Sequence, residues 1–284
     1  MQADSFPTTQ SFGWPARLPP ALRVSLRLGA LVPWTLISFL VFLAGKLPAA
    51  LFHEGRRRWR HFAIRTWSRG LMSIFGMQAR VSGPTPQAPF ILVSNHLSYM
   101  DIPLLAAHLD CVFVAKAEID SWPFVNWLCR SVDTIFVDRR TRKDVVRVNR
   151  LLAERVKEGS GLVFFPEATS TSGERVHPFK PSLLQPAVEA ASPVHYCAIS
   201  YRTPSHSPPA SLSVCWWGTM GLPGHLLRIL ALPGFEAFLD FGEQPLSASH
   251  RKEMAKRLHK AVSLIFRTVR QPSFPQPSPP EEGS

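Results

Sequence analysis

A histidine and an aspartate five positions apart have the residue types and the spacing of a catalytic pair. His96 and Asp101 follow the apolar run Phe90 to Val93, which is typical of a short buried strand. The carboxylate would then lie close enough to hold the tautomer of the imidazole and to stabilise its charged form. Such a pair can remove a proton from a hydroxyl. The alternative is a surface histidine beside a helix-capping aspartate, and a metal site would need further clustered ligands.

A second polar cluster follows the apolar run Gly161 to Phe165. It has the sequence Pro-Glu-Ala-Thr-Ser-Thr over residues 166–171, so a second strand also runs into a polar turn. We therefore expect both clusters at one edge of one sheet. Glu167 and Thr169 could equally be turn residues that cap local backbone amides.

Taken together, the two clusters resemble the sequence signature of the glycerolipid acyltransferases of the lysophosphatidic acid acyltransferase type. The family signature N-H-x-x-x-x-D, F-x-x-R and F-P-E-G-T is matched by residues Asn95 to Asp101, Phe136 to Arg139 and Phe165 to Thr169. The segment Pro193 to Tyr201 looks like a fourth family block, an apolar strand. These blocks occur in the family order over residues 90–201, which is far more specific than any one of them.

The resemblance implies an enzyme that moves a fatty acyl group from a thioester to the hydroxyl of a lyso-lipid. His96 would be the general base and Asp101 its orienting partner. The expected substrate-binding residues are Arg139, Glu167, Ala168, Thr169 and Lys180. We expect no metal and no bound cofactor, with acyl-CoA or acyl carrier protein as co-substrate. The default acceptor is 1-acylglycerol-3-phosphate, and a lyso-ornithine lipid is the alternative.

Two residues depart from the family pattern. Ala168 replaces the usual glycine and would be strained if the backbone there needs a positive φ. Ser170 replaces a frequent arginine, which removes a bidentate phosphate ligand and weakens the case for a phosphate-bearing acceptor. Arg139 could instead hold a phosphate or donor headgroup, or form a salt bridge with Asp133 or Asp138. A non-catalytic protein that binds membranes on the same scaffold is the competing hypothesis.

Charge and composition indicate a membrane partner. The net charge is +12, and residues 1–75 contribute +8 of it, from 10 basic and 2 acidic residues. This basicity lies beside the most apolar segment, so we expect membrane lipids as partners and no nucleic acid. The scattered cysteines Cys111, Cys129, Cys197 and Cys215 are typical of buried thiols in a reducing compartment. We expect the active site on the cytoplasmic side of the inner (plasma) membrane.

The membrane segment has two interpretations. Residues Leu28 to Gly45 are uncharged, interrupted by Pro33, and flanked by arginines on both sides. This symmetry favours a dipping or interfacial helical hairpin over a single span. The amphipathic segment Arg56 to Phe75 would lie in the headgroup layer, pack on the catalytic domain, or do both.

The remaining pattern predicts an α/β fold, a mostly parallel sheet flanked by helices, with the N-terminal membrane-associated helical hairpin. We expect a flexible tail over residues 1–16, a membrane-associated segment over 17–75, an acyltransferase domain over 76–270 and a disordered tail over 271–284. Runs at Leu212 to Trp217 and Phe235 to Phe241 are predicted to extend the sheet. A final helix is expected from Ser249 to Arg270.

Overall fold

A single mixed sheet forms the centre of the molecule. The computed structural model describes residues 18–52, 55–116, 134–137, 151, 154–155, 158–189 and 191–269. Within them a seven-stranded sheet has the order β1-β7-β6-β2-β5-β3-β4. The strands are β1 (Met77–Ser82), β2 (Ile91–Ser94), β3 (Cys111–Lys116), β4 (Ile135–Val137), β5 (Gly161–Phe164), β6 (Val194–Arg202) and β7 (Phe235–Phe241). Neighbours are parallel except β6 with β7, which confirms the predicted mostly parallel sheet.

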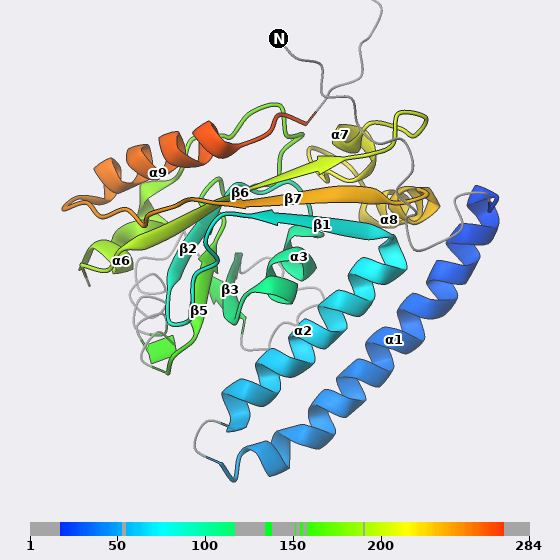
Figure 1. Ribbon diagram of the computed structural model, residues 1–284, viewed down its shortest axis with the longest axis horizontal. Helices are drawn as coiled ribbons and strands as arrows, with labels where there is room; N and C mark the ends of the chain where they lie inside the picture. Colours follow the sequence, from blue (N-terminus) through cyan, green and yellow to red (C-terminus); the bar gives the residue numbers. More distant parts are fainter. Residues whose placement is uncertain are drawn as a thin grey trace, which may run out of the picture.

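Helices cover both faces of this sheet. Figure 1 shows α9 (Arg251–Ile265) on one side, and α1 (Pro20–Ala49), α2 (Gly55–Phe75) and α3 (Asp101–His108) on the other. Shorter elements complete the described fold: η2 (Pro181–Leu184), α6 (Gln185–Glu189), α7 (Ala210–Ser213) and α8 (Leu222–Ala231). Each face has its own apolar core, one centred on α3 and the other on α9. The flanked sheet of the sequence prediction is thus confirmed.

Two predicted elements differ from the structure. Leu212 to Trp217 is not a strand: α7 ends at Ser213 and a loop follows. Two prolines, Pro208 and Pro209, precede α7 and favour the start of a helix there. The Ser213 hydroxyl also donates to the Pro209 carbonyl at 2.9 Å, which stabilises the helical turn. The last helix ends at Ile265 rather than Arg270, because Phe266 is extended and Val269 N–H donates to the Gly173 carbonyl at 2.9 Å. The predicted tails lie outside the described residues.

The N-terminal hairpin consists of α1 and α2, with its turn after α1. Pro33 lies inside α1 and does not interrupt it. Tryptophans from each helix lie over glycines of the other: a Cβ at Gly70 would be 2.1 Å from the Trp34 ring, and one at Gly45 would be 2.1 Å from the Trp59 ring. Both indoles also donate across the pair, Trp34 to the Trp67 carbonyl at 3.0 Å and Trp59 to the Phe42 carbonyl at 2.9 Å. The hairpin is therefore held by close packing and by directed hydrogen bonds.

Arginines fasten this hairpin to the rest of the protein. Arg27 is fully buried and donates to the carbonyls of Leu230 and Leu232 at the end of α8, at 2.9 and 2.7 Å. On α2, Arg57 donates to Asp110 at 2.6 Å and Arg60 donates to the Ser160 hydroxyl at 2.8 Å. The sequence interpretation counted these arginines as flanks of the membrane segment, and for those of α2 it left open whether they lie in the headgroup layer or pack on the catalytic domain. In the structure all three bind protein groups: Arg27 binds the unpaired carbonyls at a helix end, Arg57 a carboxylate and Arg60 a hydroxyl.

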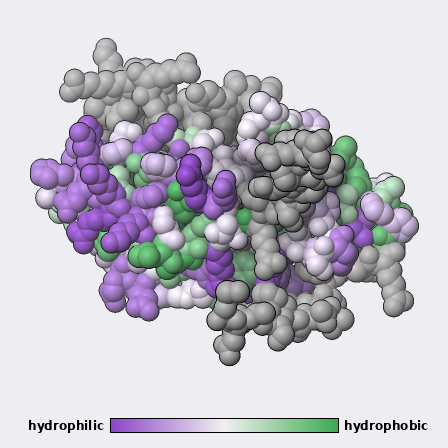
Figure 2. All heavy atoms as spheres, turned by 90° about the horizontal axis from the view of Figure 1, so that it is seen from above, coloured by the Kyte–Doolittle hydropathy of each residue, from purple (hydrophilic) through white to green (hydrophobic). Residues whose placement is uncertain are grey.

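The outer face of α1 is apolar and exposed. The helix is long and apolar enough to cross a membrane, and little of it is buried in the protein. Its large exposed side chains are Leu22, Leu26, Val32, Leu36, Ile37, Leu40, Val41, Leu43 and Leu47. The opposite side of the molecule differs: Figure 2 shows hydrophilic side chains gathered in the region of α9. An apolar face of this size on one side favours contact with lipid there.

The hairpin packing predicts different effects on stability for two glycine substitutions. Gly70→Ala should lower the free energy of unfolding by roughly 1–3 kcal/mol, because the new methyl overlaps the Trp34 ring, which its hydrogen bond holds in place. Gly29→Ala is the matched control, since no heavy atom lies within 4 Å of a Cβ there. It should be neutral or stabilising by up to about 1 kcal/mol. Thermal unfolding in detergent measures both, and equal effects of the two substitutions would contradict the packing.

Candidate active site

The structure brings His96 and Asp101 into a hydrogen bond. β2 ends at Ser94, and a tight loop leads to Asp101, the first residue of α3. The Nδ1 atom of His96 lies 2.7 Å from Oδ2 of Asp101, whose side chain is fully buried while that of His96 is 23% exposed. A carboxylate can only accept, so Nδ1 carries the proton and Nε2 keeps its lone pair. The imidazole can therefore accept a proton from a group at the surface.

Asp101 also organises the loop that carries His96. Its Oδ2 accepts the backbone N–H groups of Leu97 at 2.8 Å and Ser98 at 3.1 Å. Its Oδ1 accepts the Tyr201 hydroxyl at 2.5 Å. The carboxylate thus accepts four hydrogen bonds, which is the condition under which a charged group can be buried.

The second polar cluster surrounds His96 on its other side. The Phe165 ring stacks on the imidazole with centroids 4.2 Å apart. Backbone N–H of His96 donates to Glu167 at 3.3 Å, and Thr171 N–H donates to the His96 carbonyl at 3.0 Å. β2 and β5 are parallel neighbours, so their carboxyl ends coincide. This confirms the expectation that both clusters lie at one edge of the sheet.

Glu167 is a buried carboxyl group beside the catalytic loop. Its side chain accepts the backbone amides of His96 and His177, while Oε2 has no hydrogen-bond partner among the described residues. Burial raises the pKa of Glu167 to about 8, and the nearby Asp101 charge adds to this, although the two amide bonds act in the opposite direction. Near neutral pH the group is therefore largely protonated and can donate a hydrogen bond.

Ala168 has the strained backbone that the sequence interpretation considered. Its φ is 67°, in the left-handed region that glycine adopts without cost. The residue is also buried. Alanine at this position therefore stores on the order of 1 kcal/mol of strain beside the site, which fits the family preference for glycine there.

The remaining predicted binding residues are Thr169, Lys180 and Arg139. Thr169 and Lys180 are exposed, and Lys180 N–H donates to the Pro166 carbonyl at 2.9 Å, which places Lys180 beside the second cluster. The Ser170 hydroxyl donates to the Trp216 carbonyl. Arg139 lies outside the described residues, and its predicted role stays a prediction.

A third segment, which the sequence interpretation took for a strand, connects the two clusters. Trp216 N–H donates to the Leu97 carbonyl at 2.8 Å, and its own carbonyl accepts the Ser170 hydroxyl. In buried His225, Nδ1 lies 3.0 Å from the Tyr99 hydroxyl and Nε2 lies 3.1 Å from the Cys215 carbonyl oxygen. Burial lowers the pKa of His225 to about 4, so it is neutral and structural. These contacts join residues far apart in the chain, so no local sequence motif predicts them.

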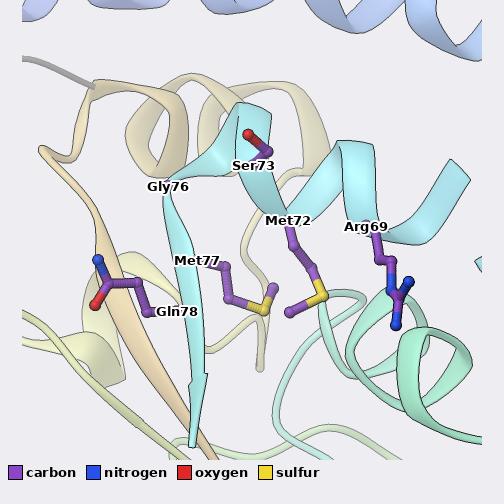
Figure 3. A pocket seen from close by; sticks show the side chains of 6 residues that line it. All are labelled: Arg69, Met72, Ser73, Gly76, Met77 and Gln78. Carbon is purple, nitrogen blue, oxygen red and sulfur yellow. The ribbon is translucent and has the colours of Figure 1, made fainter. Parts of the chain in front are cut away.

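An open pocket of about 330 Å³ lies elsewhere, where α2 runs into β1. Figure 3 shows its lining: Arg69, Met72 and Ser73 from α2, and Gly76, Met77 and Gln78 at the start of β1. None of these is a predicted site residue. Among the described residues no three His, Cys, Asp or Glu side chains gather as a metal site would require.

Comparison with known proteins agrees with this geometry. The family model described as Acyltransferase matches residues 78–200, which include the His96 and Glu167 clusters. A lyso-ornithine lipid O-acyltransferase from Pseudomonas aeruginosa is 34% identical over 88% of this chain and 95% of its own length. The chain belongs to the acyltransferase family. It is an enzyme that acts on lyso-lipids, and the hypothesis of a non-catalytic membrane-binding protein is set aside.

Further relatives of the acyltransferase fall into two groups by their names. A lyso-ornithine lipid O-acyltransferase from Rhodobacter capsulatus is 30% identical over 87% of this chain and 93% of its own. A 1-acyl-sn-glycerol-3-phosphate acyltransferase from Neisseria meningitidis is 32% identical over 64% of this chain and 71% of its own. The crystal structure of PlsC, the 1-acyl-sn-glycerophosphate acyltransferase of Thermotoga maritima, has the same fold. It aligns with a TM-score of 0.61 at 23% identity, over 85% of this chain and 95% of that one.

The buried Glu167 carboxyl predicts a specific pH dependence of stability. With a folded-state pKa of about 8 against an ordinary value of 4.5, the folded protein binds more protons in this interval, so stability falls as the pH rises from about 4.5 to 8. Glu167→Gln should remove this loss, which is on the order of a few kcal/mol. Denaturant unfolding at several pH values measures the difference.

The exposed residue Glu174 supplies the control for this measurement. Glu174→Gln should follow the wild-type curve. If Glu167→Gln also followed it between pH 4.5 and 8, the buried carboxyl would not be protonated in the folded protein.

Proposed function

We propose that His96 is the general base of this acyltransferase and that the acceptor is the hydroxyl of a lyso-ornithine lipid. The donor is an acyl thioester, either acyl-CoA or acyl carrier protein, and no bound cofactor takes part. The observation that carries the catalytic role is the 2.7 Å hydrogen bond from Nδ1 to buried Asp101, which leaves Nε2 to accept a proton.

The reaction then proceeds by direct transfer. As the acceptor hydroxyl attacks the thioester carbonyl carbon, its proton passes to Nε2 of His96, and Asp101 stabilises the imidazolium that forms. Collapse of the tetrahedral species breaks the carbon–sulfur bond. The leaving thiolate takes the proton from His96, so an ester and a free thiol are released and the base is regenerated. The Phe165 ring stacked on the imidazole limits its motion throughout.

The headgroup assignment rests on residue 170 and its surroundings. Ser170 stands where the family pattern often has an arginine, the residue expected to bind an acceptor phosphate, and its hydroxyl donates to the Trp216 carbonyl. A zwitterionic acceptor needs no such cation, and the relatives at 34% and 30% identity, which cover most of this chain, are named lyso-ornithine lipid O-acyltransferases. We assign acceptor binding to the second cluster, through Glu167, Ala168 and Thr169, and to neighbouring Lys180.

A second acceptor, 1-acylglycerol-3-phosphate, is supported by a different observation. The Neisseria meningitidis relative that is 32% identical over 64% of this chain is named for it. Arg139, predicted from the F-x-x-R block, would then supply the cation for its phosphate.

We place the site on the cytoplasmic side of the inner membrane, with α1 against the lipid. The exposed apolar face of α1 supports membrane contact, and the free buried thiols Cys111, Cys197 and Cys215 fit a reducing compartment. Acyl thioesters do not cross bilayers. Acyl-CoA added to sealed inside-out vesicles should therefore be consumed, and consumption only in right-side-out vesicles would contradict this placement.

Catalysis by His96 predicts a large loss on its removal. Purified protein in mixed micelles with acyl-CoA and lyso-ornithine lipid should release free thiol in step with ester formation. His96→Ala should slow turnover by about 10²–10⁴-fold, the usual contribution of a general base. Exposed His206 provides the control, and His206→Ala should keep wild-type turnover. Folded His96→Ala protein that turned over within about threefold of wild type would refute the proposed base.

The role of residue 170 predicts a change in headgroup preference. Ser170→Arg should raise the rate with lysophosphatidic acid relative to lyso-ornithine lipid by roughly 10-fold or more, because it adds a charge-assisted hydrogen bond to phosphate. Ser170→Gln is the matched control: it also loses the bond to Trp216 and is also long, but it carries no charge. Its preference ratio should stay near that of wild type. If the arginine and glutamine variants gave the same ratio, the headgroup would lie away from residue 170.

A further inference from the structure

A tyrosine on β6 reaches the buried carboxylate of the catalytic pair. Tyr201 lies near the end of β6, and its hydroxyl donates to Oδ1 of Asp101 at 2.5 Å. The two residues are 100 positions apart in the chain. The contact exists because β6 runs parallel to β2 and continues beyond it: β2 ends at Ser94, opposite Cys197, and the next residues of β6 carry Tyr201 past that end, where Asp101 lies.

The position of this hydroxyl is fixed by its surroundings. The Tyr201 side chain is 3% exposed, and its ring meets the edge of Phe235 with centroids 5.8 Å apart. Burial and the neighbouring carboxylate raise the pKa of Tyr201 far above its ordinary value, so the hydroxyl stays protonated. Tyr201 is therefore a permanent donor to Asp101 that has almost no surface of its own for substrate.

The two oxygens of Asp101 have different partners. Oδ2 accepts from His96 and from the two loop amides, whereas Oδ1 accepts from Tyr201. Donors at both oxygens fix the rotation of the carboxylate plane, and this rotation sets the direction of the bond to the imidazole. A general base loses efficiency quickly when its orientation drifts.

We propose that Tyr201 is a positioning residue for acyl transfer, which holds the Asp101 carboxylate in the plane that orients His96. This inference rests on the proposed function, in which His96 is the base. Tyr201 then affects the rate of the chemical step and has no effect on substrate binding.

Steady-state kinetics of Tyr201→Phe test the inference. The ring is kept and only the hydroxyl is lost, so we expect kcat to fall about 10-fold while KM for donor and acceptor stays within about twofold. Combining it with Asp101→Asn should add no further loss beyond about twofold, because the hydroxyl acts through this carboxylate. Tyr196→Phe, on the same strand with its ring against Gly242, is the control and should match wild type.

Three results would overturn the inference. They are an unchanged kcat for folded Tyr201→Phe, a rise in KM alone, and losses that multiply in the double variant. The proposed function fails separately, if His96→Ala stays active. If His96→Ala and Asp101→Asn were impaired while Tyr201→Phe kept wild-type activity, only the proposed role of Tyr201 would be refuted.

Discussion

The fully buried Asp101 carboxylate is the interaction on which the site depends. A buried charge is tolerated only when donors surround it, and here they come from three places: the imidazole, the loop before α3 and strand β6. The same bonds that satisfy the charge therefore close the loop, set the tautomer of His96 and tie β6 to the catalytic edge. Asn95 strengthens this last link, since its side chain pairs with both backbone groups of Ile199 at 2.7 and 2.9 Å.

The membrane hairpin is part of the same folded body. Buried Arg27 anchors α1 to the end of α8, and α8 carries His225, which contacts Tyr99 in the catalytic loop. On the other helix, Arg57 and Arg60 bind the residues that lead into β3 and β5. The apolar face of α1 can thus meet lipid while the active site is held at a set position relative to the bilayer. An interfacial enzyme whose acceptor is a lipid needs such a fixed relation.

The sequence predicted the parts that depend on local pattern. Apolar runs ending in polar turns were enough to place His96, Asp101 and Glu167 at one sheet edge, because parallel neighbours end together. Contacts that depend on remote pairing were not predictable: Tyr201 looked like one more strand residue, and Trp216 looked like part of a strand. The partner of Arg27 was not predictable for a related reason. An arginine in the sequence does not reveal whether its guanidinium binds a lipid headgroup or a buried carbonyl. Strain at Ala168 was only partly predictable. The sequence showed that alanine would be strained if its φ were positive, and the structure shows that φ is positive.

The state of the His96 ring tests the central claim most directly. ¹⁵N NMR of protein labelled at the histidine nitrogens, with His96 assigned by its loss in His96→Ala, reports which ring nitrogen carries the proton when the ring is neutral. Because Asp101 accepts from Nδ1, we predict a protonated Nδ1 and a bare Nε2 that is free to act as the base. A neutral ring with its proton on Nε2 would contradict the proposed role of the Asp101 carboxylate.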